Sequence, residues 1–279
     1  MNNIEKREKI YARVKEHYDY LRFKGYEVVC TCLQGSQNYG LDEYSEEYMS
    51  DVDTKSIILP SLDDFINAVP PKSETIVLPN NEHAEIKDIR VMFEMFKKMN
   101  ISYIELLYSD YIVINPAWED YIQTLFSQRD NIAAHNRNQF LRCIAGMAME
   151  KRKALCHPYP SIVDKIMKYG YDGKQLSHCA RLAEFIGKYV GGVPLEGCYK
   201  STQRELLMNF KKQKDADGRP LDVKTAIKYC DSYCDIIQSI KNVFVTKEEK
   251  IYPVAAEILK YVQSAILKEH MKRSLENER

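Results

Sequence analysis

Apolar residues recur every three or four positions over the first 24 residues of the chain, and this spacing predicts an amphipathic helix. After residue 25 the pattern changes to short, β-branched apolar segments bounded by turn residues, which is typical of buried strands. The apolar stripe of the predicted helix consists of Ile10, Val14, Tyr18 and Leu21. Strands are expected at residues 26–33, 51–59, 74–78 and 83–88, the last two joined by a turn at Pro79-Asn80-Asn81.

Helical spacing returns after residue 88, where two short helices are expected between residues 89 and 107 with a break near Asn100. After Pro116 strand signals vanish, and Pro253 is expected in the first turns of the last helix or at a kink in it. The longer helices are expected at residues 139–155, 172–190, 221–244 and 247–271, with a polar loop at 211–217.

This change of composition predicts two domains with a boundary near residue 115. Residues 1–115 are expected to form an α/β (α+β) domain with a mixed β-sheet. Residues 116–279 are expected to form an all-helical domain that closes the active-site cleft.

The composition is that of an ordinary globular protein, with 45% hydrophobic and 29% charged residues. Lysine plus arginine number 40 and aspartate plus glutamate number 40, so the formal net charge is zero and bulk attraction to nucleic acid is not indicated. The charged first 22 residues lack the apolar centre of a signal peptide, and no run approaches the roughly 20 apolar residues that span a bilayer. A cytoplasmic location without a membrane partner is therefore expected.

The eight cysteines contain no CxxC pair and are expected to be free thiols packed as small apolar residues. Cys230 and Cys234 lie one helical turn apart and are expected to line a core. His83, His135 and His157 have no cysteine or histidine partner at metal-ligand spacing, so no zinc site is expected.

Two short polar motifs lie at the ends of consecutive expected strands. Gly35 and Ser36 follow the first strand, and Asp51 and Asp53 open the next. In a strand, residues two apart point to one face, so the two carboxylates would lie side by side while Val52 turns into the core. Paired carboxylates suit Mg²⁺, or Mn²⁺, together with the phosphates of a nucleoside triphosphate. Glycine lets the backbone approach a phosphate, serine donates a hydrogen bond, and a following helix N-terminus would add a favourable dipole.

A third carboxylate on a neighbouring strand would complete a two-metal site. Glu85, on the alternating segment from His83 to Asp88, is the first candidate, and Asp88 competes with it. The alternative is that Glu85 is a surface glutamate paired with Lys87 or another cation.

Three basic residues follow one stripe of the helix expected at residues 172–190. Lys174, His178 and Arg181 lie at positions i, i+4 and i+7, a pattern that suits a phosphate ligand but also an ordinary solvated face. Asp172 and Gln175 fit a capping box at the start of this helix. The opposite side carries Leu176, Cys179, Ala183 and Ile186.

The order of these motifs resembles the DNA polymerase beta-like nucleotidyltransferase superfamily. Its signature is a Gly-Ser pair followed by DxD on a strand, here with 14 residues between Ser36 and Asp51. GSQNYGL and SDVDTKSI resemble in particular the RlaP-type predicted nucleotidyltransferases, and KxxxHxxRL of that family matches from Lys174 to Leu182. The chain departs from the family in carrying Asn100-Ile101 where Asn-Pro is common. Matching positions in the first two motifs are Gly35, Ser36, Tyr39, Gly40, Leu41, Ser50, Asp51 and Asp53.

The resemblance, which covers roughly residues 30–185, implies transfer of a nucleoside monophosphate from a nucleoside triphosphate to an acceptor hydroxyl, with release of pyrophosphate. It implies that Asp51, Asp53 and Glu85 bind the metal ions and take part in catalysis. The residues it implies for nucleotide binding are Gly35, Ser36, Lys174, His178 and Arg181.

Several points stay open at the level of sequence. The acceptor could be RNA, a small molecule with a hydroxyl group, another nucleotide or a protein side chain, because this fold serves all of these. The donor nucleotide and the oligomeric state are not determined. Two other functions are compatible with the sequence: a nucleotide-binding sensor without turnover, and a helical scaffold with a vestigial α/β part.

Overall fold

The computed structural model describes residues 3–44, 50–248 and 251–277. Contacts between Cα atoms divide the chain into two compact units. The first, here called the sheet unit, consists of Met1–Asn38, Asp42–Asn136 and Ile251–Arg279. The second, here called the helical unit, consists of Tyr39–Leu41 and Arg137–Lys250. The predicted fold class, a mixed sheet with helices followed by a helical region, is confirmed.

The sheet unit is built on five strands in the order β3-β4-β2-β1-β5. β2 and β4 are parallel, and the other neighbouring pairs are antiparallel, so the sheet is mixed as predicted. The strands are β1 (Glu27–Gln34), β2 (Asp53–Leu59), β3 (Ser73–Val77), β4 (His83–Asp88) and β5 (Ile112–Ile114).

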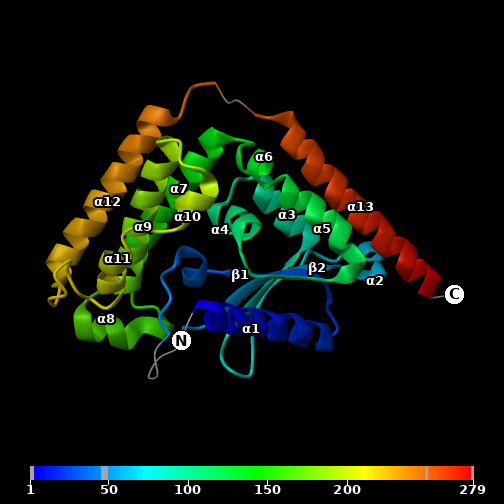
Figure 1. Cartoon of the computed structure of the whole chain (residues 1–279), viewed down its shortest axis with the longest axis horizontal. Helices are drawn as coiled ribbons and strands as arrows, with labels where there is room; N and C mark the ends of the chain where they lie inside the picture. Colours follow the sequence, from blue (N-terminus) through cyan, green and yellow to red (C-terminus); the bar gives the residue numbers. More distant parts are fainter. Residues whose placement is uncertain (1–2, 45–49, 249–250, 278–279) are drawn as a thin grey trace. The chain divides into compact units, whose positions relative to one another are not determined.

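Helix α1 (Asn3–Phe23) lies along one face of this sheet (Figure 1). Its predicted stripe is buried, from Ile10 at 1% exposed to Leu21 at 0%. These side chains pack on one face of the sheet, where Ala84 and Ile86 of β4 show the two-residue period of a strand and a bulge between Val28 and Cys30 interrupts it in β1. The other members of this core in or next to the strands are Val28, Leu33, Val52, Ile58 and Val113.

The remaining helices of the sheet unit lie between the strands and after them in the chain. Helix α3 begins after Asp88, whose side chain accepts a hydrogen bond from the backbone N–H of Arg90, and it buries four apolar residues. Helix α4 begins at the predicted break, whereas α2, α5 and α6 were not predicted. The helices are α2 (Leu62–Ile66), α3 (Ile89–Lys97), α4 (Ile101–Ile104), α5 (Glu119–Ser127) and α6 (Arg129–Ala133), with 3-10 helices at Ser36–Tyr39, Glu105–Tyr108 and Pro116–Trp118.

The sheet unit extends beyond the predicted boundary at residue 115, because α5, α6 and the last helix α13 (Pro253–Asn277) pack within it. In Figure 1 α13 runs beside α3 and α5. Trp118, 1% exposed, lies under the guanidinium of Arg273 from α13 at 4.7 Å. A sequence pattern read locally gives no signal for such a return of the chain.

The helical unit is a bundle of α7, α9 and α12, with α10 and α11 packed on α9. Phe140 from α7 and Phe185 from α9 meet edge to face at 6.0 Å in its core. Its helices are α7 (Arg137–Ala154), α8 (Val163–Tyr169), α9 (Gly173–Val190), α10 (Leu195–Tyr199), α11 (Arg204–Lys211) and α12 (Val223–Phe244), with a 3-10 helix at Pro160–Ile162.

Three expectations need correction. β2 begins at Asp53, so Asp51 and Val52 lie in the loop before the strand and not in it. The short strand β5 was not predicted, since three residues give too short a pattern to detect. The last helix begins at Pro253 and not at residue 247, because proline favours the first helical position; residues 249 and 250 lie outside the described part of the chain.

Across the described residues, each helix is too short or too polar to cross a lipid bilayer.

Candidate active site

The Gly-Ser and Asp-x-Asp motifs lie side by side at one end of the sheet. β1 and β2 are antiparallel with Gln34 opposite Asp53, so the residues that follow Gln34 lie beside those that precede Asp53. A direct link joins the two motifs: the side-chain Nε2 of Gln37 donates to the backbone oxygen of Asp51 at 2.7 Å. The predicted proximity of the two motifs is therefore present within the sheet unit.

Gly35 takes a backbone conformation with φ of +90°, which explains glycine at this position. A Cβ at this position would meet no atom within 4 Å, so the space beside the backbone is open. Ser36 then begins a single 3-10 turn rather than an α-helix. The expected dipole of a following helix is reduced to that of one turn, because the macrodipole grows with the number of aligned peptides.

The loop before β2 exposes Asp51 and buries Val52, as the alternation predicted. The backbone of this loop is held from two sides. The carboxylate of Glu82 accepts the N–H of Val52 at 2.7 Å, and the guanidinium of Arg13 donates to the backbone oxygen of Ser50 at 3.0 Å. Asp51 is thus held on a loop that is fixed at Ser50 and Val52, and Asp53 follows as the first residue of β2.

Glu82 is the centre of a buried cluster that the sequence analysis missed. It is 2% exposed, forms an ion pair with Arg13, and lies 2.9 Å from Nε2 of His17. The other ring nitrogen of His17 lies 2.8 Å from the hydroxyl of Thr54 in β2. No local signal pointed to Glu82, because it lies in the polar turn between two expected strands and its partners Arg13 and His17 belong to α1.

Burial and the charge of Arg13 lower the pKa of His17 to about 4. The imidazole is therefore neutral at pH 7. This protonation fits a ring that donates to the Glu82 carboxylate through Nε2 and accepts from the Thr54 hydroxyl through Nδ1.

Asp53 and Glu85 lie on the face of the sheet opposite α1. In the parallel register of β2 and β4, Lys55 lies opposite Glu85, and Asp53 is two residues before Lys55 on the same face. Asp53 is partly exposed, and its Oδ1 lies 3.3 Å from Nδ1 of His83. Each of the two carboxylates has a buried oxygen, Oδ1 of Asp53 and Oε2 of Glu85, and each of these oxygens lies close to one nitrogen, that of His83 or of Lys55.

Glu85 also has a structural role that matches the alternative considered for it. Its Oε2 lies 2.9 Å from Nζ of Lys55, and its Oε1 lies 3.9 Å from Nζ of Lys87. Lys55 is 4% exposed and also lies 3.9 Å from the centre of the Tyr103 ring. Glu85 therefore neutralises a buried lysine in this structure.

Asp88, the competing third carboxylate, is already used elsewhere. It lies opposite Ile58 in the register, five positions along the strand from Asp53 and on the α1 face. Its carboxylate accepts hydrogen bonds from the backbone and the guanidinium of Arg90, at 2.7 to 2.9 Å. Of the two candidates, Glu85 is the one on the same face as Asp53.

The basic stripe of α9 lies in the helical unit, where its three residues differ in exposure. Lys174 is exposed, His178 is half-buried and Arg181 is 5% exposed, so the stripe is not a uniformly solvated face. Asp172 caps the helix by accepting from the N–H of Lys174 at 3.1 Å. Gln175 donates to the carboxylate of Asp172, and the backbone N–H of Asp172 donates to the oxygen of Leu155 instead of to Gln175, so the predicted box is present only as a cap.

Arg181 stacks on the ring of Tyr39, with its guanidinium carbon 3.7 Å from the ring centre. Tyr39 belongs to the short segment Tyr39–Leu41 that packs in the helical unit. There the backbone N–H of Ser201 donates to the backbone oxygen of Tyr39 at 3.3 Å. Nε and Nη1 of Arg181 are buried and make no hydrogen bond to the described residues. A nearly buried guanidinium with unused donors suits an anionic ligand.

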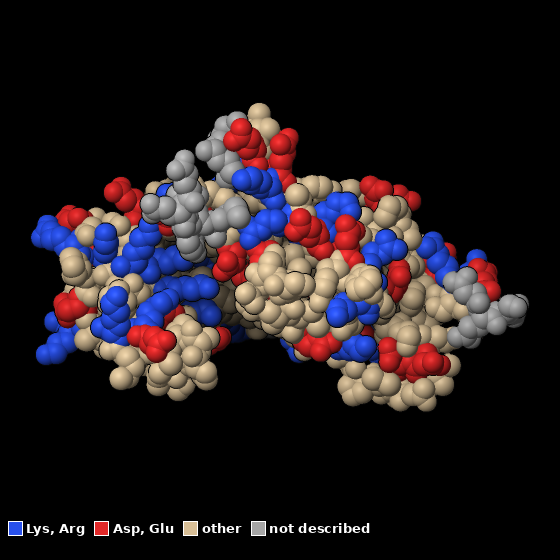
Figure 2. All heavy atoms as spheres, turned by 90° about the horizontal axis from the view of Figure 1, so that it is seen from below, with Lys and Arg blue, Asp and Glu red and all other residues tan. Residues whose placement is uncertain are grey.

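Several cations surround His178. Burial and the charges of Arg181, Lys174, Lys151 and Lys211 lower its pKa well below the usual value. The sequence did not connect Lys151 on α7 and Lys211 on α11 with this stripe, because they belong to other helices. On the face of the molecule shown in Figure 2, Lys and Arg side chains gather on the part that the helical unit forms.

Comparisons with known proteins leave the family of the chain undetermined. No protein-family model matches the chain, and no curated protein matches it. One solved structure that is similar is a nucleotidyltransferase-like protein from Exiguobacterium sibiricum 255-15, at 10% identity and a TM-score of 0.29. The alignment covers 81% of this chain and 72% of that chain. At this TM-score the likeness carries no argument, so the functional case rests on the residues described above.

Proposed function

We propose that this chain is a metal-dependent nucleotidyltransferase that transfers a nucleoside monophosphate from a nucleoside triphosphate to an acceptor hydroxyl. The observation that carries the proposal is the register between β1 and β2, in which Gln34 lies opposite Asp53. It brings a glycine-serine turn, suited to phosphate, next to a pair of carboxylates, suited to a divalent cation.

The carboxylates fit Mg²⁺ or Mn²⁺ by their chemistry. Asp51 is exposed, and the buried oxygens of Asp53 and Glu85 lie 3.3 Å from Nδ1 of His83 and 2.9 Å from Nζ of Lys55. Oxygen ligands of this kind suit a hard cation. Asp51, Asp53 and Glu85 would hold such ions, which when bound stabilise charge on the phosphates and lower the pKa of the acceptor hydroxyl.

In the proposed reaction the acceptor oxygen attacks the α-phosphorus of the triphosphate. A bond forms between that oxygen and the phosphorus, the bond to the β-phosphate oxygen breaks, and pyrophosphate leaves with the electron pair. Glu85 receives the proton of the hydroxyl or serves as a metal ligand. Gly35 and Ser36 bind the β- and γ-phosphates through the backbone and the serine hydroxyl.

Lys174, His178 and Arg181 are proposed to bind the phosphates and to offset the charge that develops on them. Arg181 supports this role best, because its unused donors are buried and its plane is already fixed by Tyr39. A side chain that is ordered before the ligand arrives loses less entropy on binding.

The direct test is calorimetric titration of the protein with each of the four nucleoside triphosphates, with and without Mg²⁺ or Mn²⁺. We expect metal-dependent binding of at least one triphosphate. Asp51→Asn should lose the metal-dependent binding of the triphosphate. Asp63→Asn, which changes an exposed carboxylate of α2, should bind the triphosphate as the wild type does. The absence of triphosphate binding under all conditions would refute the proposal.

A nucleotide-binding sensor without turnover is the second candidate, and the ion pair of Glu85 with Lys55 favours it. That pair, with its atoms 2.9 Å apart, occupies the oxygen a second metal ion would use. Pyrophosphate release distinguishes the two: a sensor would bind the triphosphate and release none, even with a broad panel of hydroxyl acceptors.

A further inference from the structure

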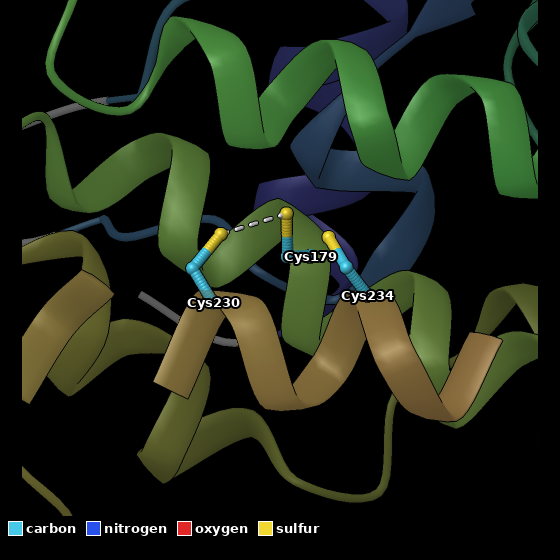
Figure 3. A group of neighbouring side chains, drawn as sticks. All are labelled: Cys179, Cys230 and Cys234. Carbon is cyan, nitrogen blue, oxygen red and sulfur yellow. Dashed lines mark hydrogen bonds between the residues drawn. The ribbon is translucent and has the colours of Figure 1, made fainter. Parts of the chain in front are cut away.

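Three buried cysteines meet in the core of the helical unit, on the side of α9 opposite its basic stripe. Cys179 lies on α9, and Cys230 and Cys234 lie one turn apart on α12. Figure 3 shows their side chains directed toward one another. Their exposed fractions are 0%, 0% and 4%. This group is here called the cysteine triad.

The sulfur atoms are close enough to share one ion. All three lie within 4.8 Å of one another, and those of Cys179 and Cys230 are 3.3 Å apart. A metal–sulfur bond of about 2.3 Å would require sulfur separations of about 3.8 Å in a tetrahedron and about 4.0 Å in a trigonal plane. Either value can be reached from the observed positions by small side-chain rotations.

The triad is the one group of three potential ligand side chains at this spacing among the described residues, and it contains neither histidine nor carboxylate. Its remaining polar neighbour is the backbone oxygen of Ala148, which accepts from the thiols of Cys179 and Cys234 at 3.6 Å. A carbonyl oxygen is a hard ligand that suits other ions better. The donor set is thus three sulfurs.

Thiolates are the form of cysteine that binds metal, so the thiol protons of the triad would leave as the ion binds.

We propose that Cys179, Cys230 and Cys234 form a buried three-sulfur site for a soft monovalent ion, Cu(I). Soft thiolates select Cu(I) or Zn²⁺, and structural Zn²⁺ requires a fourth ligand that the triad lacks. The proposal is independent of the nucleotidyltransferase activity, because none of its three ligands belongs to the residues assigned to nucleotide or metal binding there.

The test uses the fully reduced full-length protein under anaerobic conditions. Cu(I) is titrated in competition with a chromophoric chelator, and the bound ion is examined by X-ray absorption. We expect one tightly bound Cu(I) per chain with a coordination shell of sulfur alone. Nitrogen or oxygen in that shell, or the absence of competition with the chelator, would overturn the proposal without the need for any variant.

Variants then assign the ligands. Cys179→Ala, Cys230→Ala and Cys234→Ala should each weaken Cu(I) binding by more than about 100-fold, since even outer-shell partners cost about 10- to 100-fold. Cys198→Ala is the matched control: Cys198 is 3% exposed, lies in the same unit and donates to a backbone oxygen, that of Val193. Equal loss in Cys198→Ala, or retention in the triad variants, would contradict the assignment.

A thermal-shift measurement separates binding from folding. Bound Cu(I) should raise the melting temperature of the wild type and of Cys198→Ala, because a ligand that binds only the folded state stabilises it. The triad variants should melt at the same temperature with and without Cu(I). Zn²⁺ serves as the competing ion, and a higher affinity of the triad for Zn²⁺ than for Cu(I) would refute the choice of ion.

Discussion

The Glu82 carboxylate accepts the backbone N–H of Val52 at 2.7 Å, and so connects the residue before β4 to the loop that carries Asp51 and leads into Asp53 at the start of β2. The same carboxylate binds Arg13 and His17 from α1. Helix, loop and strand are therefore joined at one buried charge. Changes to this cluster should affect both the stability of the sheet unit and the position of the two aspartates.

Glu82→Gln should lower the free energy of unfolding by about 3 kcal/mol, because it leaves the partly buried Arg13 without its counter-charge. Urea denaturation measures this change. Glu94→Gln is the control, since Glu94 is half exposed and its contacts with Lys97 and Lys98 are 3.9 and 4.0 Å, which predicts less than about 0.5 kcal/mol. Equal effects of the two substitutions would show that Glu82 is not the centre of the cluster.

The neutral His17 should make stability depend on pH. Below about pH 6.5 the unfolded chain protonates this imidazole, whereas the folded chain does so only below about pH 4. Stability from this residue is therefore complete above pH 6.5 and is lost as the pH falls toward 4, by up to about 3 kcal/mol. His17→Gln should flatten this part of the curve of unfolding free energy against pH, and the exposed control His157→Gln should leave it unchanged.

The sequence predicted the parts of this molecule whose causes are local. The stripe of α1 and the helices α7, α9 and α12 follow from helical periodicity, since each buries one face. Strands β1 and β2 follow from short apolar runs bounded by turn residues, and they are buried on both faces. Val52 was correctly expected in the core, although the loop before β2 and not the strand carries it.

What the sequence could not supply are relationships between distant segments. Arg13, His17 and Glu82 are charged or polar residues on different elements, and only the packing of α1 on the sheet brings them together. The same holds for Cys179 with Cys230 and Cys234, which were expected simply to line a core. The ion pair of Glu85 with Lys55 likewise depends on the register of two strands, which no local pattern fixes.

Asp53→Asn should reduce the proposed pyrophosphate release at least 100-fold, because an amide binds a divalent cation more weakly than a carboxylate does. The fold should be kept, since Asp53 is partly exposed and makes a single close contact, with His83, among those described. Circular dichroism and the melting temperature check the fold, and Asp63→Asn is the activity control. Full turnover in Asp53→Asn would exclude the proposed mechanism.

Arg181→Ala should weaken nucleoside triphosphate binding by about 10-fold or more, because it removes a charged donor and the stack on Tyr39. Arg181→Lys should restore little of this, since lysine has neither the planar fork nor the same stacking geometry. Calorimetry with the triphosphate measures both. The control is Arg219→Ala, an exposed arginine of the same unit that pairs with Asp217. Recovery of full affinity by lysine would show that charge alone acts here.

Gly35 and Gly146 form a matched pair, because a Cβ at either position would meet no atom within 4 Å but only Gly35 has a positive φ. Gly35→Ala should therefore destabilise the protein by about 1 to 2 kcal/mol, the cost of an alanine in the left-handed region. Gly146→Ala, within α7, should instead stabilise it by up to about 1 kcal/mol, since alanine favours the helix. Urea denaturation measures both changes. If Gly35→Ala also weakens triphosphate binding while Gly146→Ala does not, the turn after β1 takes part in phosphate binding. If the affinity of Gly35→Ala for the triphosphate is unchanged, the turn serves the fold alone.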